Sequence, residues 1–183
     1  MNLHSLALAA SLAVLGVAPA HAVTYTYVGD TTTAPTFSRP FFDFSGLSGA
    51  GQNARYQALQ FTVSAAGTYD FNSVASGWDN FLFLYSPSFG AGSPLLNGLV
   101  GNDDRGAVGT AGFVRTLAAG VNYVLVTTGF DGPTDFGAYR NTIDGPGSVS
   151  VVPEPSTYAL FALGLLALSA QALRKPRLRT LAS

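Results

Sequence analysis

The sequence contains no cysteine, a single methionine and two histidines, and both histidines, His4 and His21, lie near the N-terminus. Residues 22–183 therefore offer no thiolate or imidazole for a Ser-His-Asp triad, a Cys-His pair, or a zinc or copper site built on those ligands. No disulfide can support the fold, so its stability must come from the burial of apolar surface. These absences favour a function that does not involve catalysis.

Charge is also scarce, since only 10% of the residues are Asp, Glu, Lys or Arg. Between Val23 and Ser150, nine aspartates face five arginines, which gives this region a net charge of about −4. Such a surface repels nucleic acid and anionic lipid. The same region has the length of one domain and is short for two.

The N-terminus has the pattern of a secretory signal peptide. An apolar run from Leu6 to Ala18 is followed by Ala20 and Ala22, which have the small-x-small spacing that signal peptidase accepts. We expect residues 1–22 to be removed by cleavage after Ala22. The first residues contain no Lys or Arg, so an N-terminal anchor that is not cleaved is the alternative.

The C-terminus has three zones in a fixed order: a short polar segment with two prolines, an apolar run from Tyr158 to Leu173, and a basic cluster. The sixteen residues of the apolar run would span about 24 Å as a helix, somewhat less than the roughly 30 Å of the hydrocarbon layer. The run is apolar on every side, which favours a transmembrane helix over the alternative, a buried core helix with one apolar stripe. The cationic residues that would hold the far end in the cytoplasm are Arg174, Lys175, Arg177 and Arg179.

These zones together resemble the PEP-CTERM sorting tail of Gram-negative bacteria, which here covers residues 152–179. The motif residues are Val152, Pro153, Glu154, Pro155, Ser156 and Thr157. The resemblance implies that an exosortase in the inner membrane processes the chain at this motif. The processed product would reach the cell surface or the extracellular matrix, where exopolysaccharide is a possible partner. The prolines also disfavour a helix and hold the segment extended in front of the bilayer.

The region between the two ends shows the short apolar alternation of β-strands and no sustained helical period. The alternation predicts one hairpin from residues 56–63 and 68–74 and a second from residues 112–117 and 121–128. Residues 80–85 are apolar on both faces, as in a central strand, and a long loop is expected at 86–101. With a last strand at 147–152, the sequence predicts an all-β domain over residues 23–151, built as a single two-sheet sandwich.

The same region resembles the bacterial pre-peptidase C-terminal domain, a jelly-roll-like β-sandwich. The residues that carry this resemblance are Gly67-x-Tyr69-x-Phe71, Asp79-x-x-Leu82-x-Leu84-Tyr85, Asn102-Asp103-Asp104 and Leu117-x-Ala119-Gly120-x-x-Tyr123. The resemblance implies an accessory module of secreted or surface proteins, some of which bind calcium or matrix polymers.

Acidic side chains flank the predicted long loop. Asp79, Asp103 and Asp104 could supply oxygen ligands to a calcium ion, although their spacing is not that of a helix-loop-helix calcium site. The alternative is that they form turns by bonding nearby backbone N–H groups. No other cofactor is expected.

Trp78 is the candidate for contact with a ligand, because it lies in a loop beside Asp79 and its ring could stack on a sugar. The alternative is that Trp78, like Phe41, Phe42 and Phe44, belongs to the core. Two functions therefore stay open at this point: an exported protein without enzymatic activity that is displayed or shed, and a lectin-like module that binds carbohydrate or calcium.

Overall fold

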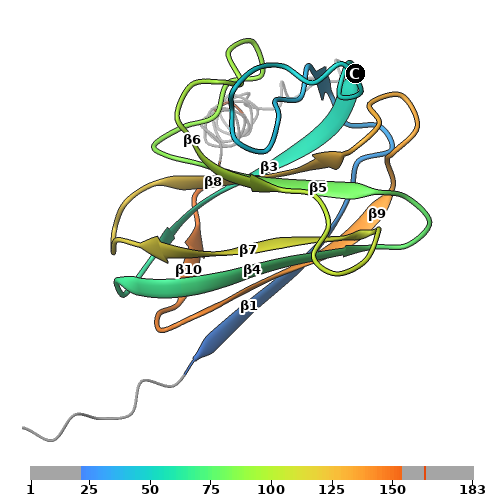
Figure 1. Cartoon of the computed structure of the whole chain (residues 1–183). Helices are drawn as coiled ribbons and strands as arrows, with labels where there is room; N and C mark the ends of the chain where they lie inside the picture. Colours follow the sequence, from blue (N-terminus) through green and yellow to red (C-terminus); the bar gives the residue numbers. More distant parts are fainter. Residues whose placement is uncertain (1–21, 154–162, 164–183) are drawn as a thin grey trace, which may run out of the picture.

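The computed structural model describes residues 22–153 and Leu163. In this part of the chain the fold consists of β-strands arranged in two sheets that face each other (Figure 1). The strands are β1 (Val23–Asp30), β2 (Thr36–Phe37), β3 (Ala54–Val63), β4 (Gly67–Ala75), β5 (Asn80–Tyr85), β6 (Gly98–Asn102), β7 (Thr110–Leu117), β8 (Tyr123–Gly129), β9 (Ala138–Gly145) and β10 (Val149–Val151). The all-β, two-sheet prediction is confirmed.

The predicted signal peptide and the predicted C-terminal helix lie outside the described residues. Within the described part, no helix is long and apolar enough to cross a membrane.

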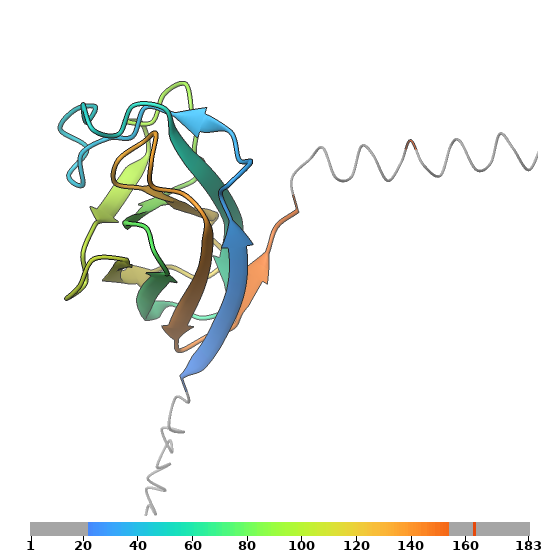
Figure 2. The same ribbon diagram turned by 90° about the vertical axis from the view of Figure 1, so that its right-hand side faces the viewer.

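One sheet has four strands in the order β1-β9-β4-β7, and the other has six, with the path β10-β3-β8-β5-β6 and β2 beside β3. The strand pairs are antiparallel throughout. Figure 2 shows the sandwich from the side, with β10 (orange) at the edge where the described chain ends.

The main core fills the space between the sheets. Strand alternation turns every second side chain inward, and Phe61 of β3, Phe71 of β4 and Leu125 of β8 meet there with no exposed surface. Aromatic rings pair across the gap, with centroids 6.2 Å apart for Phe61 and Phe71. This shared apolar layer holds the two sheets together.

A second core cluster lies on the outer face of the six-stranded sheet. Phe83 and Tyr85 of β5 point outward, and the rings of Phe44 and Phe89 from two long loops cover them. Burial on both faces explains why β5 and β8 are buried along their whole length and confirms the central strand predicted at residues 80–85.

The two predicted hairpins are wrong, although their strands exist. β3 pairs with β8 and β4 pairs with β7, so each Ala-Ala-Gly turn carries the chain from one sheet to the other instead of back along the same sheet. The two turns lie together, because the N–H of Gly120 donates to the carbonyl of Val63 at 3.0 Å. A tyrosine secures each turn: Tyr69 donates to the Ala65 carbonyl at 2.7 Å, and the hydroxyl of Tyr123 accepts from the N–H of Ala118 at 2.9 Å.

The loop predicted at residues 86–101 is too long, because its last residues form β6, which pairs with β5. Strands β1, β2 and β9 were not predicted. Of these, β1 and β9 form one side of the four-stranded sheet.

Candidate functional site

A pocket of about 610 Å³ opens on the covered side of the six-stranded sheet, and we call it the Arg39 pocket. The loop between β2 and β3, the end of β6 and the segment after β8 contribute its walls. Its lining residues are Arg39, Phe41, Phe42, Ser48, Gly49, Ala50, Phe81, Asn102, Asp103, Asp104 and Phe130.

Arg39 forms the base of this pocket and is only 2% exposed. Its guanidinium donates to the carbonyls of Pro40 and Phe130, both at 2.9 Å, and to the hydroxyl of Ser48 at 3.2 Å. The Arg39 guanidinium also lies over two aromatic rings, 4.5 Å from the centroid of Phe81. Burial lowers the pKa of Arg39 and the neighbouring Asp103 and Asp79 raise it, but a guanidinium stays charged in proteins.

The three predicted acidic residues meet beside the pocket, which Asp103 and Asp104 line. Carboxylate oxygens of Asp79, Asp103 and Asp104 lie within 4.8 Å of one another. Asp79 precedes β5, whereas Asp103 and Asp104 follow β6, and the pairing of β5 with β6 brings these two strand ends together. We call these three residues the Asp cluster.

The electrostatics of the Asp cluster favour a cation. Burial and then the charges of Asp79 and Asp104 together raise the pKa of Asp103 to about 6, against the opposing effect of Arg39. Burial, followed by the charge of Asp104, also raises the pKa of Asp79. A divalent cation among these carboxylates would relieve their mutual repulsion.

Unpartnered oxygens distinguish the Asp cluster from ordinary turn formers. One carboxylate oxygen of Asp79 and one of Asp103 are buried without a hydrogen-bond partner. By contrast, Asp30 and Asp43 each accept from the backbone N–H two residues later, at 2.8 and 3.1 Å. Buried polar atoms are normally satisfied, and carboxylate oxygens are ligands that calcium prefers.

Trp78 lies beside the Asp cluster but faces the protein. It is 8% exposed, and its indole N–H donates to the carbonyl of Ala138 at 3.1 Å. Phe42, at 62%, Phe41 and Phe130 are exposed aromatic rings at the Arg39 pocket, whereas Phe44 packs on the second core cluster. Sequence reasoning missed Phe130, which follows β8 and whose carbonyl holds Arg39.

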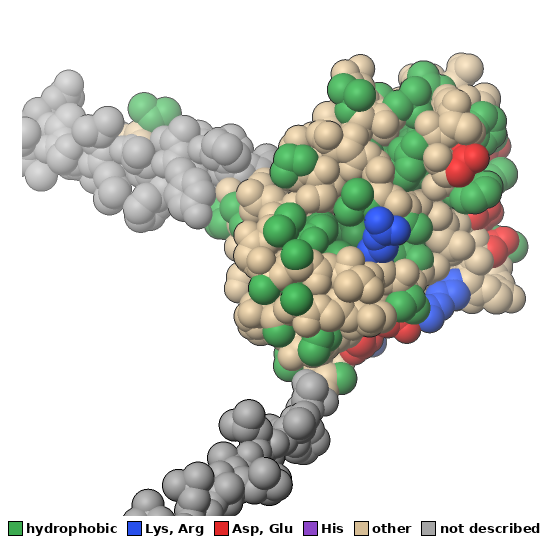
Figure 3. All heavy atoms as spheres, turned by 60° about the vertical axis from the view of Figure 1, so that its left-hand side comes forward, with side chains coloured by type: hydrophobic (Ala, Val, Ile, Leu, Met, Phe, Trp, Pro, Cys, Tyr) green, Lys and Arg blue, Asp and Glu red, His purple; other side chains and the backbone are tan. Residues whose placement is uncertain are grey.

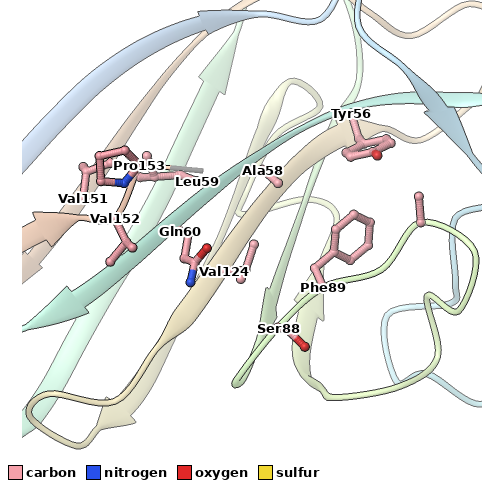
Figure 4. A pocket seen from close by; sticks show the side chains of 11 residues that line it. Tyr56, Ala58, Leu59, Gln60, Ser88, Phe89, Val124, Val151, Val152 and Pro153 are labelled. Carbon is pink, nitrogen blue, oxygen red and sulfur yellow. The ribbon is translucent and has the colours of Figure 1, made fainter. Parts of the chain in front are cut away.

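A second hollow, of about 390 Å³, lies where the sandwich meets the predicted sorting motif, and we call it the outer groove (Figure 4). Tyr56 and Gln60 of β3 line it together with Phe89, and Val152 and Pro153 close one end. The chain is held here because the N–H of Val152 donates to the carbonyl of Gln60 at 2.8 Å. Of the motif, Val152 and Pro153 are described, whereas Glu154, Pro155, Ser156 and Thr157 lie outside the described residues, as do the basic residues and the signal peptidase site.

The surface offers little charge for recognition. On the face in Figure 3, charged side chains are few and lie among hydrophobic and uncharged polar ones. Over the described residues, the Asp cluster is the one group of three or more acidic, histidine or cysteine side chains close enough to share a metal ion.

Comparison with known proteins identifies the C-terminal segment. Residues 151–175 match the PEP-CTERM protein-sorting motif, which confirms the motif predicted from the sequence. No curated protein matches the chain. The chain therefore carries the signal by which an exosortase sorts exported proteins to the cell surface.

Two solved structures are similar to the sandwich. One is the pre-peptidase C-terminal domain of collagenase from Bacillus anthracis, with 16% identity and a TM-score of 0.41 over 70% of this chain and 90% of that one. The other is PliG of Aeromonas hydrophila, a periplasmic inhibitor of g-type lysozyme, with 11% identity and a TM-score of 0.38 over 73% and 89% of the two chains. Because both TM-scores are low, the description of the fold rests on the strand pairing of this chain alone.

Proposed function

We propose that this protein is a β-sandwich without enzymatic activity that a Gram-negative bacterium exports and that an exosortase then releases or attaches at the cell surface. The observation that carries the proposal is the match of residues 151–175 to the sorting motif, which begins at the last residue of β10. The displayed part is the sandwich, and exopolysaccharide outside the cell is its proposed surroundings.

The proposed route begins with signal peptidase, which cuts after Ala22. The apolar run 158–173 then holds the chain in the inner membrane, with the basic residues 174–179 on the cytoplasmic side. The sandwich lies outside, and the segment with two prolines stands between it and the bilayer. This order makes the motif the only link between the displayed domain and the anchor.

The proposed absence of catalysis is supported by the chemistry that the domain can offer. Beyond His21 the chain has neither histidine nor cysteine, so the general base of any acid-base step, or of a step that activates a hydroxyl nucleophile, would be a carboxylate. The carboxylates that do gather, in the Asp cluster, lie near the buried cation of Arg39.

Replacement of Pro153-Glu154-Pro155 by three alanines tests the proposal. In a host with an active exosortase, the parent should yield a product shortened at the C-terminus, and the alanine variant should keep its tail. Cleavage after Ala22 should be the same in both, which controls for export. Equal tail cleavage in the two proteins would reject recognition at this motif.

A second candidate function, calcium binding, is favoured by the unpartnered oxygens of the Asp cluster. We expect calcium to raise the melting temperature of the purified protein and the double variant D103N/D104N to lose that response. The matched control is D43N, which removes an exposed carboxylate that caps a turn. Equal calcium responses in all three proteins, or none in the parent, would reject the site.

A further inference from the structure

β3 has an incompletely covered outer edge. At one end β2 pairs with Ala54 and Arg55, and at the other β10 pairs with residues 61–63. Between them, residues 56–60 have no strand partner on this side within the part of the chain that the structure describes. A bare stretch of sheet edge offers backbone donors and acceptors to an added strand.

The neighbouring hydrogen bonds show which groups face this edge. The N–H of Tyr56 donates outward to the carbonyl of Pro35 at 3.0 Å, and the carbonyl of Gln60 accepts outward from Val152 at 2.8 Å. Backbone groups alternate sides along a strand, so Ala58, halfway between, also turns its N–H and C=O to the bare edge. Its side chain is exposed.

The register of β10 determines what would come next along this edge. Val149 opposes Val63 and Val151 opposes Phe61, and the bond from Val152 to Gln60 continues the same ladder. If the pairing continued, Glu154 would oppose Ala58. Pro153 would oppose Leu59 and Pro155 would oppose Gln57.

The order Pro-Glu-Pro suits this continuation. In the extended register the N–H of Glu154 would face β3 and could donate to the free carbonyl of Ala58. Pro153 and Pro155 would occupy the alternate positions, whose N–H groups point away from the sheet. A proline, which has no N–H, is tolerated on an edge strand only at such positions.

The two faces of the sheet beside this edge also suit the side chains of the Pro-Glu-Pro segment. Directly opposed residues share a face of the sheet, so Glu154 would lie with Ala58 over the outer groove, near the amide of Gln60 and the hydroxyl of Ser88. On the other side, a hollow of about 540 Å³ includes the rings of Tyr27 and Tyr139. The two prolines would turn toward these rings.

We propose that the sorting motif docks on the bare edge of β3 as a continuation of β10, so that the folded sandwich holds its own processing site. The exosortase must then displace residues 153–155 from β3 before it can cut. This inference rests on the proposed function for its consequence, but the docking itself requires no other protein.

Cysteine cross-linking tests the docking without an exosortase, because the chain has no cysteine of its own. In the purified full-length protein, A58C/E154C should form a disulfide within one chain, since hydrogen-bonded pairs place their Cα atoms about 5.5 Å apart. The control A58C/T157C moves the second cysteine out of register and should stay reduced. A disulfide between two chains, or equal yields in the two variants, would overturn the inference.

Insertions between Val152 and Pro153 test the effect on processing while they leave the motif intact. One inserted alanine turns both prolines toward β3 and prevents docking, and cleavage should become about fivefold faster, since one net backbone hydrogen bond is worth about this factor. Two inserted alanines would place Glu154 opposite Tyr56, whose outward N–H already donates to Pro35, so the motif would stay undocked and cleavage should be as fast as with one alanine. A steady increase with insertion length, or equal rates in all three proteins, would overturn the inference. If the parent is not cleaved, the proposed function fails instead.

Discussion

The two sheets share one apolar layer but differ on their outer faces. The outer face of the four-stranded sheet is open to solvent, and Val114 of β7 is 55% exposed there. The outer face of the six-stranded sheet carries Phe81, Phe83 and Tyr85 under two long loops. The Arg39 pocket, the Asp cluster and the outer groove all lie on the covered side, because only there do loops stand above a rigid sheet.

The four-stranded sheet therefore has one structural role, whereas the six-stranded sheet has two. The four-stranded sheet closes the main core and presents polar side chains and exposed valines outward, among them Val28 and Val74. The six-stranded sheet closes the same core and also anchors the loops that build the candidate sites. Loops on a rigid scaffold are the usual place for binding residues.

The largest expected loss of stability comes from truncating a buried ring that packs under the loops of the six-stranded sheet. F83A deletes a ring with no exposed surface that packs on Phe44 and Phe81, and it should lower the free energy of unfolding by about 4 kcal/mol. V114A, on the open face, should lower it by less than about 0.5 kcal/mol. Urea unfolding of the purified proteins measures both. Similar losses would mean that the two faces do not differ in stability.

The next largest loss of stability is expected from replacing the buried cation Arg39. R39M would leave the carbonyls of Pro40 and Phe130 without a donor, and we expect a loss of about 3 kcal/mol in the free energy of unfolding. R140M, on the exposed face of β9, is the matched control and should change little. If both substitutions cost the same by urea unfolding, Arg39 does not hold the pocket together.

A smaller effect is expected from pH. Because the pKa of Asp103 is raised to about 6 in the folded protein and is about 3.9 when unfolded, the folded state binds more protons between these values. The contribution of Asp103 to stability is therefore present below about pH 4 and is lost as the pH rises toward 6. In EDTA, the melting temperature of the parent relative to D103N should fall by a few degrees from pH 4 to pH 7. A constant difference would contradict the raised pKa.

The smallest expected effect belongs to the surface ion pair of the four-stranded sheet. Arg105 contacts Asp70 with both side chains partly exposed, and such pairs contribute about 0.5 kcal/mol. A double-mutant cycle with D70N and R105M measures the coupling free energy. A coupling above about 2 kcal/mol would show that the open face is more than a cover for the core.

Strands could be predicted where apolar residues alternate with polar ones or follow one another without interruption. Residues 80–85 were placed correctly as a central strand because both of their faces are apolar. β9 was missed because Arg140, Thr142 and Asp144 line its solvent-facing side and leave few apolar residues in its sequence. The hairpins were wrong because alternation shows only which face of a strand is buried. It does not show whether the next turn returns to the same sheet or crosses to the other.

The candidate site was predicted in part. Asp79 precedes the predicted central strand, Asp103 and Asp104 follow the expected loop, and the pairing of β5 with β6 brings the three together. The burial of Arg39 and Trp78 could not be predicted, because it depends on contacts with residues about 90 and 60 positions away. The bare edge of β3 likewise depends on the extents of β2 and β10, which no local pattern reveals.

Intact mass spectrometry of the protein from cells with and without an exosortase tests the central claim most directly. With the enzyme, we predict a product that begins at Val23 and has lost the apolar run and the basic tail by cleavage within residues 152–157. Without it, the product should begin at Val23 and keep its C-terminus. The same C-terminus from both cells would contradict the account.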